Sequence, residues 1–168
     1  MRIKIQKSTK RDLPAFYKLF KKSLFEDFKE FSPEVANFQW RRHRKKNLLK
    51  WIKKGDEYIF TAKNIEGKIV GFLVSQKLVG GVAECDWLIV SRGFRGQGIG
   101  HRLMSFWERW VKKMKGHMLA LFSDRKLIKY YRKLGFKEYG YLRGGYFGES
   151  DYLLYKRLGK WNQKSLKS

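Results

Sequence analysis

The sequence predicts a single α/β domain of three layers, in which a mixed sheet of about seven strands has helices on both faces. Strand-like and helix-like segments alternate through the middle of the chain, as right-handed crossovers between parallel strands require. Glycine-marked turns join strand-like segments near both ends, which indicates antiparallel hairpins. The 168 residues suit one domain, which we expect at 1–158, followed by a polar, basic tail at 159–168.

The individual elements follow from periodicity and from capping signals. Thr9, with Asp12 three residues later, is a helix-start signal. Pro33 restarts a helix, which is expected to run through a basic stretch to residue 52 and to end before Gly55. In order, the expected elements are a strand at 2–7, helices after Thr9 and at Pro33, strands at 57–62, 68–75 and 83–90, a helix at 99–114, a strand at 117–122, a helix at 124–134 and two strands within 137–155.

A glycine-rich segment, Arg95-Gly96-Gln97-Gly98-Ile99-Gly100, lies between an apolar run that ends at Val90 and the helical pattern that starts at Ile99. Glycines let the backbone approach a ligand closely, and the first N–H groups of a helix are unpaired at the positive end of its dipole. Such a turn binds pyrophosphate. A tight turn also needs glycine for steric reasons alone, so only the spacing of the glycines can distinguish a phosphate-binding turn from a purely structural one. Neither the P-loop pattern nor the dinucleotide fingerprint fits it.

The spacing resembles the Gln/Arg-x-x-Gly-x-Gly/Ala signature of the GNAT superfamily of acetyl-CoA-dependent N-acetyltransferases, with Arg95, Gly98 and Gly100 in the defining places. About thirty residues downstream, Tyr130-Tyr131-Arg132-Lys133-Leu134-Gly135-Phe136 is similar to the family's Leu-Tyr-x-x-Leu-Gly-Phe segment. The resemblance covers residues 58–155. It implies a GNAT fold and transfer of an acetyl group from acetyl-CoA, the co-substrate, to an amine.

The donor would be held mainly by backbone. The N–H groups of the glycine-rich segment are the candidates for the pyrophosphate, with Arg92 and Arg95 adding charge. The resemblance implies that main-chain groups of the preceding strand face the pantetheine arm and the thioester. Where the family usually has Asn, at the start of the short helix, this chain has Asp124, whose charge repels phosphate. The expected co-substrate-binding residues are Leu88, Ile89, Val90, Arg95, Gly96, Gln97, Gly98, Ile99, Gly100 and Asp124.

Acetyl transfer also needs a base and a proton donor. Glu84 and Asp86 share one face of their strand, and Glu84 falls where histone-type members of the superfamily carry their glutamate base. Asp86 or a water chain is the reserve, and the alternative is that Glu84 is solvated or paired with a cation at a strand end. Tyr131 matches the tyrosine whose hydroxyl commonly lies near the CoA sulfur; otherwise it is core or rim. Residues 117–122 lack the glutamate typical of N-terminal acetyltransferases, which weakens that assignment.

The charge is unusual: 39 Lys and Arg against 15 Asp and Glu give +24. The phosphates of CoA account for only part of such a field. The basic patches are either a solvated surface or contacts for nucleic acid, a ribosome or an acidic protein, and the sequence leaves both open. Acidic residues are scarce, and in the fold resembled here a group of them would lie over the acceptor cleft: Glu26, Asp27, Glu30 and Glu34. They indicate either a cationic amine as the acceptor or, equally, ordinary surface charge.

Three functions from different classes remain. The strongest is an N-acetyltransferase acting by direct attack through a ternary complex on a small cationic amine or on a protein lysine or N-terminus. The second is a nucleic-acid- or ribosome-associated module on the same fold, and the third is a CoA-binding domain without turnover. We expect no metal site and a core role for Cys85. With no long apolar run and no signal-peptide core, we expect a cytoplasmic protein without membrane contact; a homodimer is left open.

Overall fold

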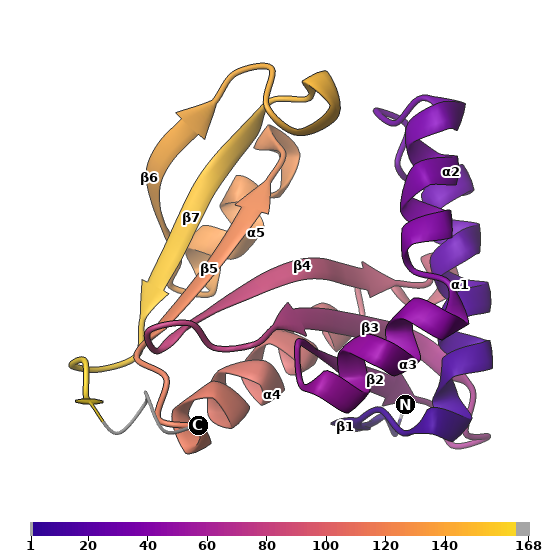
Figure 1. Cartoon of the computed structure of the whole chain (residues 1–168), viewed down its shortest axis with the longest axis horizontal. Coiled ribbons are helices and arrows are strands. Elements are labelled where there is room, and N and C mark those ends of the chain that lie inside the picture. Colours follow the sequence, from indigo (N-terminus) through magenta and orange to yellow (C-terminus); the bar gives the residue numbers. More distant parts are fainter. Residues whose placement is uncertain (1, 164–168) are drawn as a thin grey trace. The chain divides into compact units, whose positions relative to one another are not determined.

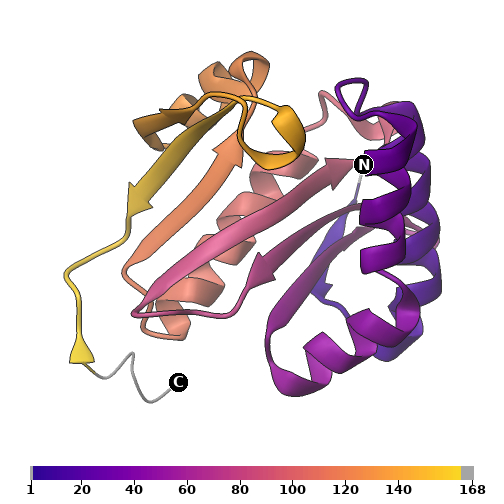
Figure 2. The same ribbon diagram turned by 45° about the horizontal axis from the view of Figure 1, so that its top comes forward.

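The structure is a computed structural model that describes residues 2–163, and its seven-stranded sheet has the order β1-β2-β3-β4-β5-β7-β6 (Figures 1 and 2). The strands are β1 (Lys4–Lys7), β2 (Glu57–Lys63), β3 (Ile69–Gln76), β4 (Val82–Val90), β5 (Met118–Ser123), β6 (Lys137–Leu142) and β7 (Asp151–Arg157). The α-helices are α1 (Leu13–Glu26), α2 (Pro33–Arg42), α3 (Lys45–Lys54), α4 (Ile99–Lys113) and α5 (Ile128–Lys133). The predicted α/β class with a mixed sheet of about seven strands is confirmed. Of the predicted tail, residues 164–168 lie outside the described residues.

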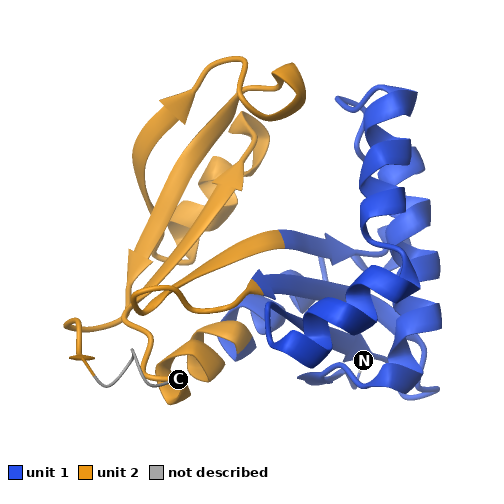
Figure 3. Ribbon diagram, in the orientation of Figure 1, with its two compact units in different colours: residues 1–75, 87–106 blue, residues 76–86, 107–168 orange. Residues whose placement is uncertain are grey.

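The chain forms two compact units (Figure 3). The first comprises residues 1–75 and 87–106, and the second comprises residues 76–86 and 107–168. Strand β4 and helix α4 each contribute to both units, since the divisions fall inside these two elements.

In the first unit, helices cover both faces of β3. A Cβ placed on Gly71 would lie 3.4 Å from the side chains of Ile99 and Leu103 in α4. The next residue, Phe72, packs its ring against Phe16 of α1 with centroids 4.4 Å apart. Because neighbouring side chains of a strand point to opposite faces, α4 and α1 lie on opposite sides of this part of the sheet. This is the three-layer order that the sequence predicts.

The helix-start signal at Thr9 is confirmed, although the first turn is a 3₁₀ turn, η1 (Lys10–Asp12), that leads directly into α1. The backbone N–H of Thr9 donates to the Asp12 carboxylate at 2.9 Å, and the N–H of Asp12 donates to the Thr9 carbonyl at 3.0 Å. Asp12 is also paired with Lys63 at the end of β2. Burial tends to raise the pKa of Asp12, but the hydrogen bonds from Lys63 and Thr9 hold it below its usual value. The start of α1 is therefore tied to the sheet by an ionised carboxylate.

The prediction of one continuous helix from Pro33 to residue 52 is wrong, because the chain leaves the helix at His43 and forms α2 and α3 instead. The His43 ring is 3% exposed and lies 4.7 Å from the ring of Phe20. Its Nδ1 contacts the carbonyl of Gln39 at 2.8 Å. Arg44 is extended, at φ −57° and ψ 151°, before α3 begins. The break between the two helices thus coincides with the burial of His43 in the core. Hydrophobic periodicity does not predict this break, because the apolar pattern continues on both sides of it.

The second unit is built on strands β5, β7 and β6 with α5. Strands β5 and β7 pair antiparallel from Met118 opposite Arg157 to Ser123 opposite Tyr152. Alternate residues of β5, including Leu119 and Leu121, are buried, as expected for a strand with one covered face. The predicted short helix after β5 is confirmed as α5, and the two predicted strands are confirmed as β6 and β7, with the glycines between them.

Candidate active site

The glycine-rich segment forms the turn between β4 and α4 in the first unit. A 3₁₀ turn, η2 (Arg92–Phe94), leads into it, and the N–H of Arg95 closes that turn on the carbonyl of Arg92. At the helix start, the N–H of Arg102 bonds to the carbonyl of Gly98 at 3.0 Å. The N–H groups of the residues before Arg102 therefore precede the intrahelical ladder and lie at the positive end of the helix dipole. The turn therefore has the unpaired N–H groups that an anion-binding site needs, and the bound anion stays a prediction.

The backbone of this turn has the conformation that requires glycine. Gly96 and Gly98 both have φ +73°, a left-handed conformation that side chains with a Cβ adopt at a cost. A Cβ added at either position would meet no atom within 4 Å. Residues Arg95 to Gly98 are exposed, whereas Ile99 is 2% exposed and anchors the helix start. The two glycines thus expose their backbone to solvent rather than to another part of the described chain.

The two arginines beside the turn are held by one carboxylate. Arg92 Nε lies 2.7 Å from Asp27 Oδ1, and an Arg95 guanidinium nitrogen lies 2.7 Å from Asp27 Oδ2. Arg95 Nε also donates to the carbonyl of Val90 at 2.9 Å, and Arg92 donates to the carbonyl of Glu26. Burial tends to raise the pKa of Asp27, but Arg92 and Arg95 hold it below its usual value. The structure therefore gives these arginines a partner that the sequence analysis did not identify.

The three predicted residues at the end of β4 differ in the exposure of their side chains. Ile89 is 4% exposed and belongs to the core of the first unit, whereas Leu88 and Val90 are half-buried. The N–H of Ser91 bonds to the carbonyl of Val70 on β3 at 2.9 Å. The side chain of Ile89 is thus committed to packing, and a ligand contact at this residue would have to be made by its main chain.

The pairing of β4 with β5 covers only part of β4. It is parallel and runs from Val82 opposite Met118 to Cys85 opposite Leu121. Strand β4 itself continues to Val90. This ladder lies within the second unit, and the parting of the two strands that the family resemblance implies stays a prediction.

Glu84 and Asp86 both contact Gln76, which the sequence analysis missed. The Gln76 side-chain amide lies 2.8 Å from Asp86 Oδ1 and 3.4 Å from Glu84 Oε1. Burial, and then the negative charge of Asp86, raise the pKa of Glu84 above its usual value. The predicted common face is confirmed, since one amide reaches both carboxylates. The signal for Gln76 was a polar residue ending the otherwise buried strand β3.

The two adjacent tyrosines of α5 differ in their surroundings. Tyr131 is 6% exposed, and its ring lies 5.8 Å from that of Phe136. Burial raises its pKa well above the usual value, with smaller effects from Cys85, Tyr130 and Asp124. Burial and Cys85 raise the pKa of Tyr130 to about 12. The Tyr130 hydroxyl is buried and has no hydrogen-bond partner within residues 2–163, so it is available to a ligand group.

The predicted residue Asp124 serves as a helix cap. Its carboxylate accepts the N–H of Leu127 at 3.1 Å at the start of η3 (Arg125–Leu127), the turn that leads into α5. The capping role that its position suggests is therefore present.

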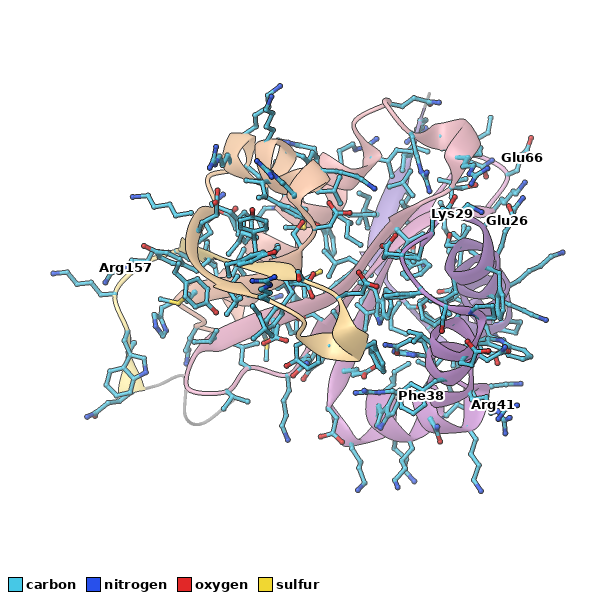
Figure 4. The ribbon with its side chains drawn as sticks, turned by 90° about the horizontal axis from the view of Figure 1, so that it is seen from above. Glu26, Lys29, Phe38, Arg41, Glu66 and Arg157 are labelled. Carbon is cyan, nitrogen blue, oxygen red and sulfur yellow. The ribbon has the colours of Figure 1, made fainter. Side chains whose placement is uncertain are left out.

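Two of the acidic residues expected over the acceptor cleft, Glu26 and Asp27, have different cationic partners. Asp27 neutralises two arginines, and Glu26, which Figure 4 labels, lies 3.8 Å from Lys22 on the same helix.

Within the described part of the chain, no group of three or more His, Cys, Asp or Glu side chains is arranged to hold a metal ion. Among residues 2–163, none of the helices has the length and hydropathy that a membrane crossing requires.

The fold and the turn define a family. The model of the acetyltransferase (GNAT) family matches residues 14–136, and the chain belongs to this family. It is 30% identical over 149 residues to an uncharacterised N-acetyltransferase of Methanocaldococcus jannaschii. That match covers 83% of this chain but only 63% of the longer relative.

Solved structures share the fold. The PaiA N-acetyltransferase of Thermoplasma acidophilum, in complex with coenzyme A, has a TM-score of 0.80 at 22% identity, with 94% of this chain and 99% of that chain covered. The ribosomal-protein-S18-alanine N-acetyltransferase of Escherichia coli has a TM-score of 0.73 at 20% identity, with 96% and 97% covered.

Proposed function

We propose that this protein transfers an acetyl group from acetyl-CoA to a primary amine by direct attack within a ternary complex. The observation that carries the proposal is the turn before α4, where Gly96 and Gly98 expose left-handed backbone at a helix N-terminus. Such backbone binds a diphosphate without side chains. The family membership supports the same donor.

The turn's own charge balance supports a backbone-centred site. Asp27 engages both Arg92 and Arg95, so these guanidinium groups are already paired without a ligand. We infer that they fasten the turn to the end of α1, and that the N–H groups of Gly96 to Gly100 bind the diphosphate of acetyl-CoA. Fastening reduces the ordering cost of binding, since the turn is held in one conformation beforehand.

Glu84 is the proposed base. The amine nitrogen attacks the thioester carbonyl carbon, the nitrogen loses a proton to Glu84, and the C–S bond breaks to release the CoA thiolate. The raised pKa of Glu84 supports this role, because a carboxylate accepts a proton more readily as its pKa rises toward the working pH. Asp86 is the reserve base. Its charge next to Glu84 also favours a cationic amine over a neutral one.

Tyr131 is the proposed proton donor to the thiolate, on its match to the family segment. Tyr130 is the second candidate, since its buried hydroxyl lacks a partner among the described residues. With their raised pKa values, both hydroxyls keep their protons at neutral pH and are able to donate a hydrogen bond to a thiolate.

The test combines donor binding with turnover. Calorimetry with CoA and acetyl-CoA measures the first, and thiol release with a panel of polyamines, aminoglycosides, lysine peptides and peptides with free N-termini measures the second. We expect binding heat and amine-dependent thiol release. Tyr131→Phe should lower kcat at unchanged acetyl-CoA affinity, with Tyr130→Phe as the matched variant. Heat without release for any amine would indicate a CoA-binding domain, and the absence of heat would refute the proposal.

A further inference from the structure

Helix α3 presents a row of lysines to solvent. Five of its ten residues are lysines, and all five are exposed: Lys45, Lys46, Lys50, Lys53 and Lys54. Lys46, Lys50 and Lys53 follow the i, i+4, i+7 spacing that places side chains on one helix face. Along the axis they are separated by about 6 Å and about 4.5 Å, since each residue rises about 1.5 Å. The row therefore offers cations at short, regular intervals.

The opposite side of α3 is used for packing. Leu48 is fully buried, and Leu49, Trp51 and Ile52 pack against the core of the first unit. An amphipathic helix that binds a bilayer inserts its apolar face between lipids. Because the apolar face of α3 is already covered, the lysine row fits a soluble polyanion better than a membrane surface.

The positive charge continues into the end of α2. Arg41, Arg42 and Arg44 are exposed, and Figure 4 labels Arg41 on α2. The sequence has no carboxylate between Glu34 and Asp56. The segment thus contains no acid of its own to neutralise its cations, and its field is open to a polyanionic partner.

An aromatic group adjoins these cations at α1 and α2. The rings of Tyr17 and Trp40 are stacked with centroids 6.0 Å apart, and the Lys21 ammonium lies 4.2 Å from the centroid of the Trp40 ring. Phe25 lies 6.4 Å from Trp40 and is 42% exposed. Burial raises the pKa of Tyr17 while the charge of Arg44 lowers it, so the arginine before α3 acts on this aromatic group.

We propose that this surface, the α1–α3 basic face formed by Lys21, Phe25, Arg44, Lys46, Lys50 and Lys53, binds single-stranded nucleic acid. Cations in a row along α3 contact successive phosphates, and the exposed ring of Phe25, which packs near Trp40 of α2, stacks on an unpaired base. Binding of this kind has little sequence preference and falls steeply with salt. None of the residues of this face belongs to the glycine-rich turn, and RNA binding is measured without acetyl-CoA, so the proposal is tested independently of acetyl transfer.

The test uses the whole protein and a fluorescein-labelled 20-mer of uridine, with fluorescence anisotropy measured over a range of salt concentrations. The variant K46E/K50E/K53E should bind about tenfold or more weakly and should flatten the salt slope by about two, as expected for three lost phosphate contacts to a single strand. Phe25→Ala should weaken single-strand binding about fivefold or more and leave binding to a duplex of equal length unchanged.

The matched control is K113E/K133E/K137E, which makes the same change in net charge at three exposed lysines of the second unit. It should retain most of the affinity. Equal losses in both triple variants would show that net charge alone attracts the RNA and would overturn the proposal. Three other results would also overturn the proposal. They are an absence of binding at low salt, equal effects of Phe25→Ala on single strand and duplex, and tighter binding to phosphatidylserine vesicles than to the 20-mer. Circular dichroism of each variant establishes that it is folded.

Discussion

The guanidinium of Arg95 lies 2.7 Å from the carboxylate of Asp27, so the arginine of the family signature contacts the end of α1. The same carboxylate holds Arg92 at 2.7 Å. A charge that the sequence analysis assigned to phosphate binding is thus part of an internal pairing. The diphosphate proposal consequently depends on backbone N–H groups.

Asp27→Asn should remove this fastening. The variant keeps the shape of the side chain but loses the charge that holds Arg92 and Arg95. We expect the free energy of unfolding to fall by about 1–2 kcal/mol, between the values for a buried charged hydrogen bond and a surface ion pair, because the Asp27 side chain is 12% exposed and its arginine partners are about half exposed. The KM for acetyl-CoA should rise several-fold because the turn is less ordered before binding. Thermal unfolding and steady-state kinetics measure both effects. A lower KM would instead mean that Asp27 restrains arginines that bind phosphate.

Gly98→Val tests the left-handed turn. Because nothing lies within 4 Å of an added Cβ, any effect must come from the backbone at φ +73° rather than from a clash. We expect the KM for acetyl-CoA to rise about tenfold or more, which corresponds to the cost of about 1–2 kcal/mol for a residue with a Cβ in this conformation. Gly93→Ala is the matched control, since its added Cβ is equally unobstructed and its φ lies outside the left-handed region. An unchanged KM in Gly98→Val would remove this turn from the diphosphate site.

Glu84→Gln should separate catalysis from stability. With Glu84 as the base, kcat at neutral pH should fall about a hundredfold or more while acetyl-CoA binding is retained. The folded-state pKa of Glu84 is raised, so its contribution to stability is present below its unfolded pKa and is lost as the pH rises through the folded value. At neutral pH the glutamine should therefore increase the melting temperature. Undiminished turnover would transfer the role to Asp86 or to water.

Asp86→Asn is the matched variant for the same carboxylate pair. Removing the negative charge beside Glu84 should lower the pKa of Glu84, because that charge is its second cause after burial. In a plot of kcat against pH, the acidic limb should then move to lower pH. A profile that stays in place would show that the limb belongs to another group.

His43 should make the first unit sensitive to mild acid. Burial lowers the pKa of His43 to about 4; the contact with the Gln39 carbonyl opposes this shift, and the charge of Arg42 adds a smaller decrease. The unfolded chain then takes up a proton at higher pH than the folded chain, so stability falls as the pH drops from about 6.5 to about 4. The loss should approach about 3 kcal/mol by pH 4. Chemical denaturation across this range measures it.

His43→Gln provides the comparison. It should be less stable than the wild type at pH 7, because the ring fills the core between Phe20 and Trp51, but its stability should change little between pH 6.5 and pH 4. The carboxylates with shifted pKa values, lowered at Asp12, Asp27, Glu34 and Glu108 and raised at Glu84, are present in both proteins, so their contributions cancel in the difference between wild type and variant. An unchanged pH dependence in the variant would contradict the assignment to His43.

Local signals were enough to predict most helices and strands and the glycine-rich turn before α4. Hydrophobic periodicity, the Thr9–Asp12 cap and the turn at Gly96 and Gly98 depend on residues close together in the chain, and the structure confirms each of them. The same holds for the shared face of Glu84 and Asp86, which follows from strand alternation.

Contacts between distant residues depended on the folded chain. The pairing of Asp27 with Arg92, the bridge from Gln76 to two carboxylates and the turn at His43 each join segments that a local pattern does not relate. In the sequence, only the match of Tyr131 to the family segment distinguishes it from its neighbour Tyr130. Packing separated them, because burial leaves the Tyr130 hydroxyl without a partner among the described residues, and burial is a property of the assembled core.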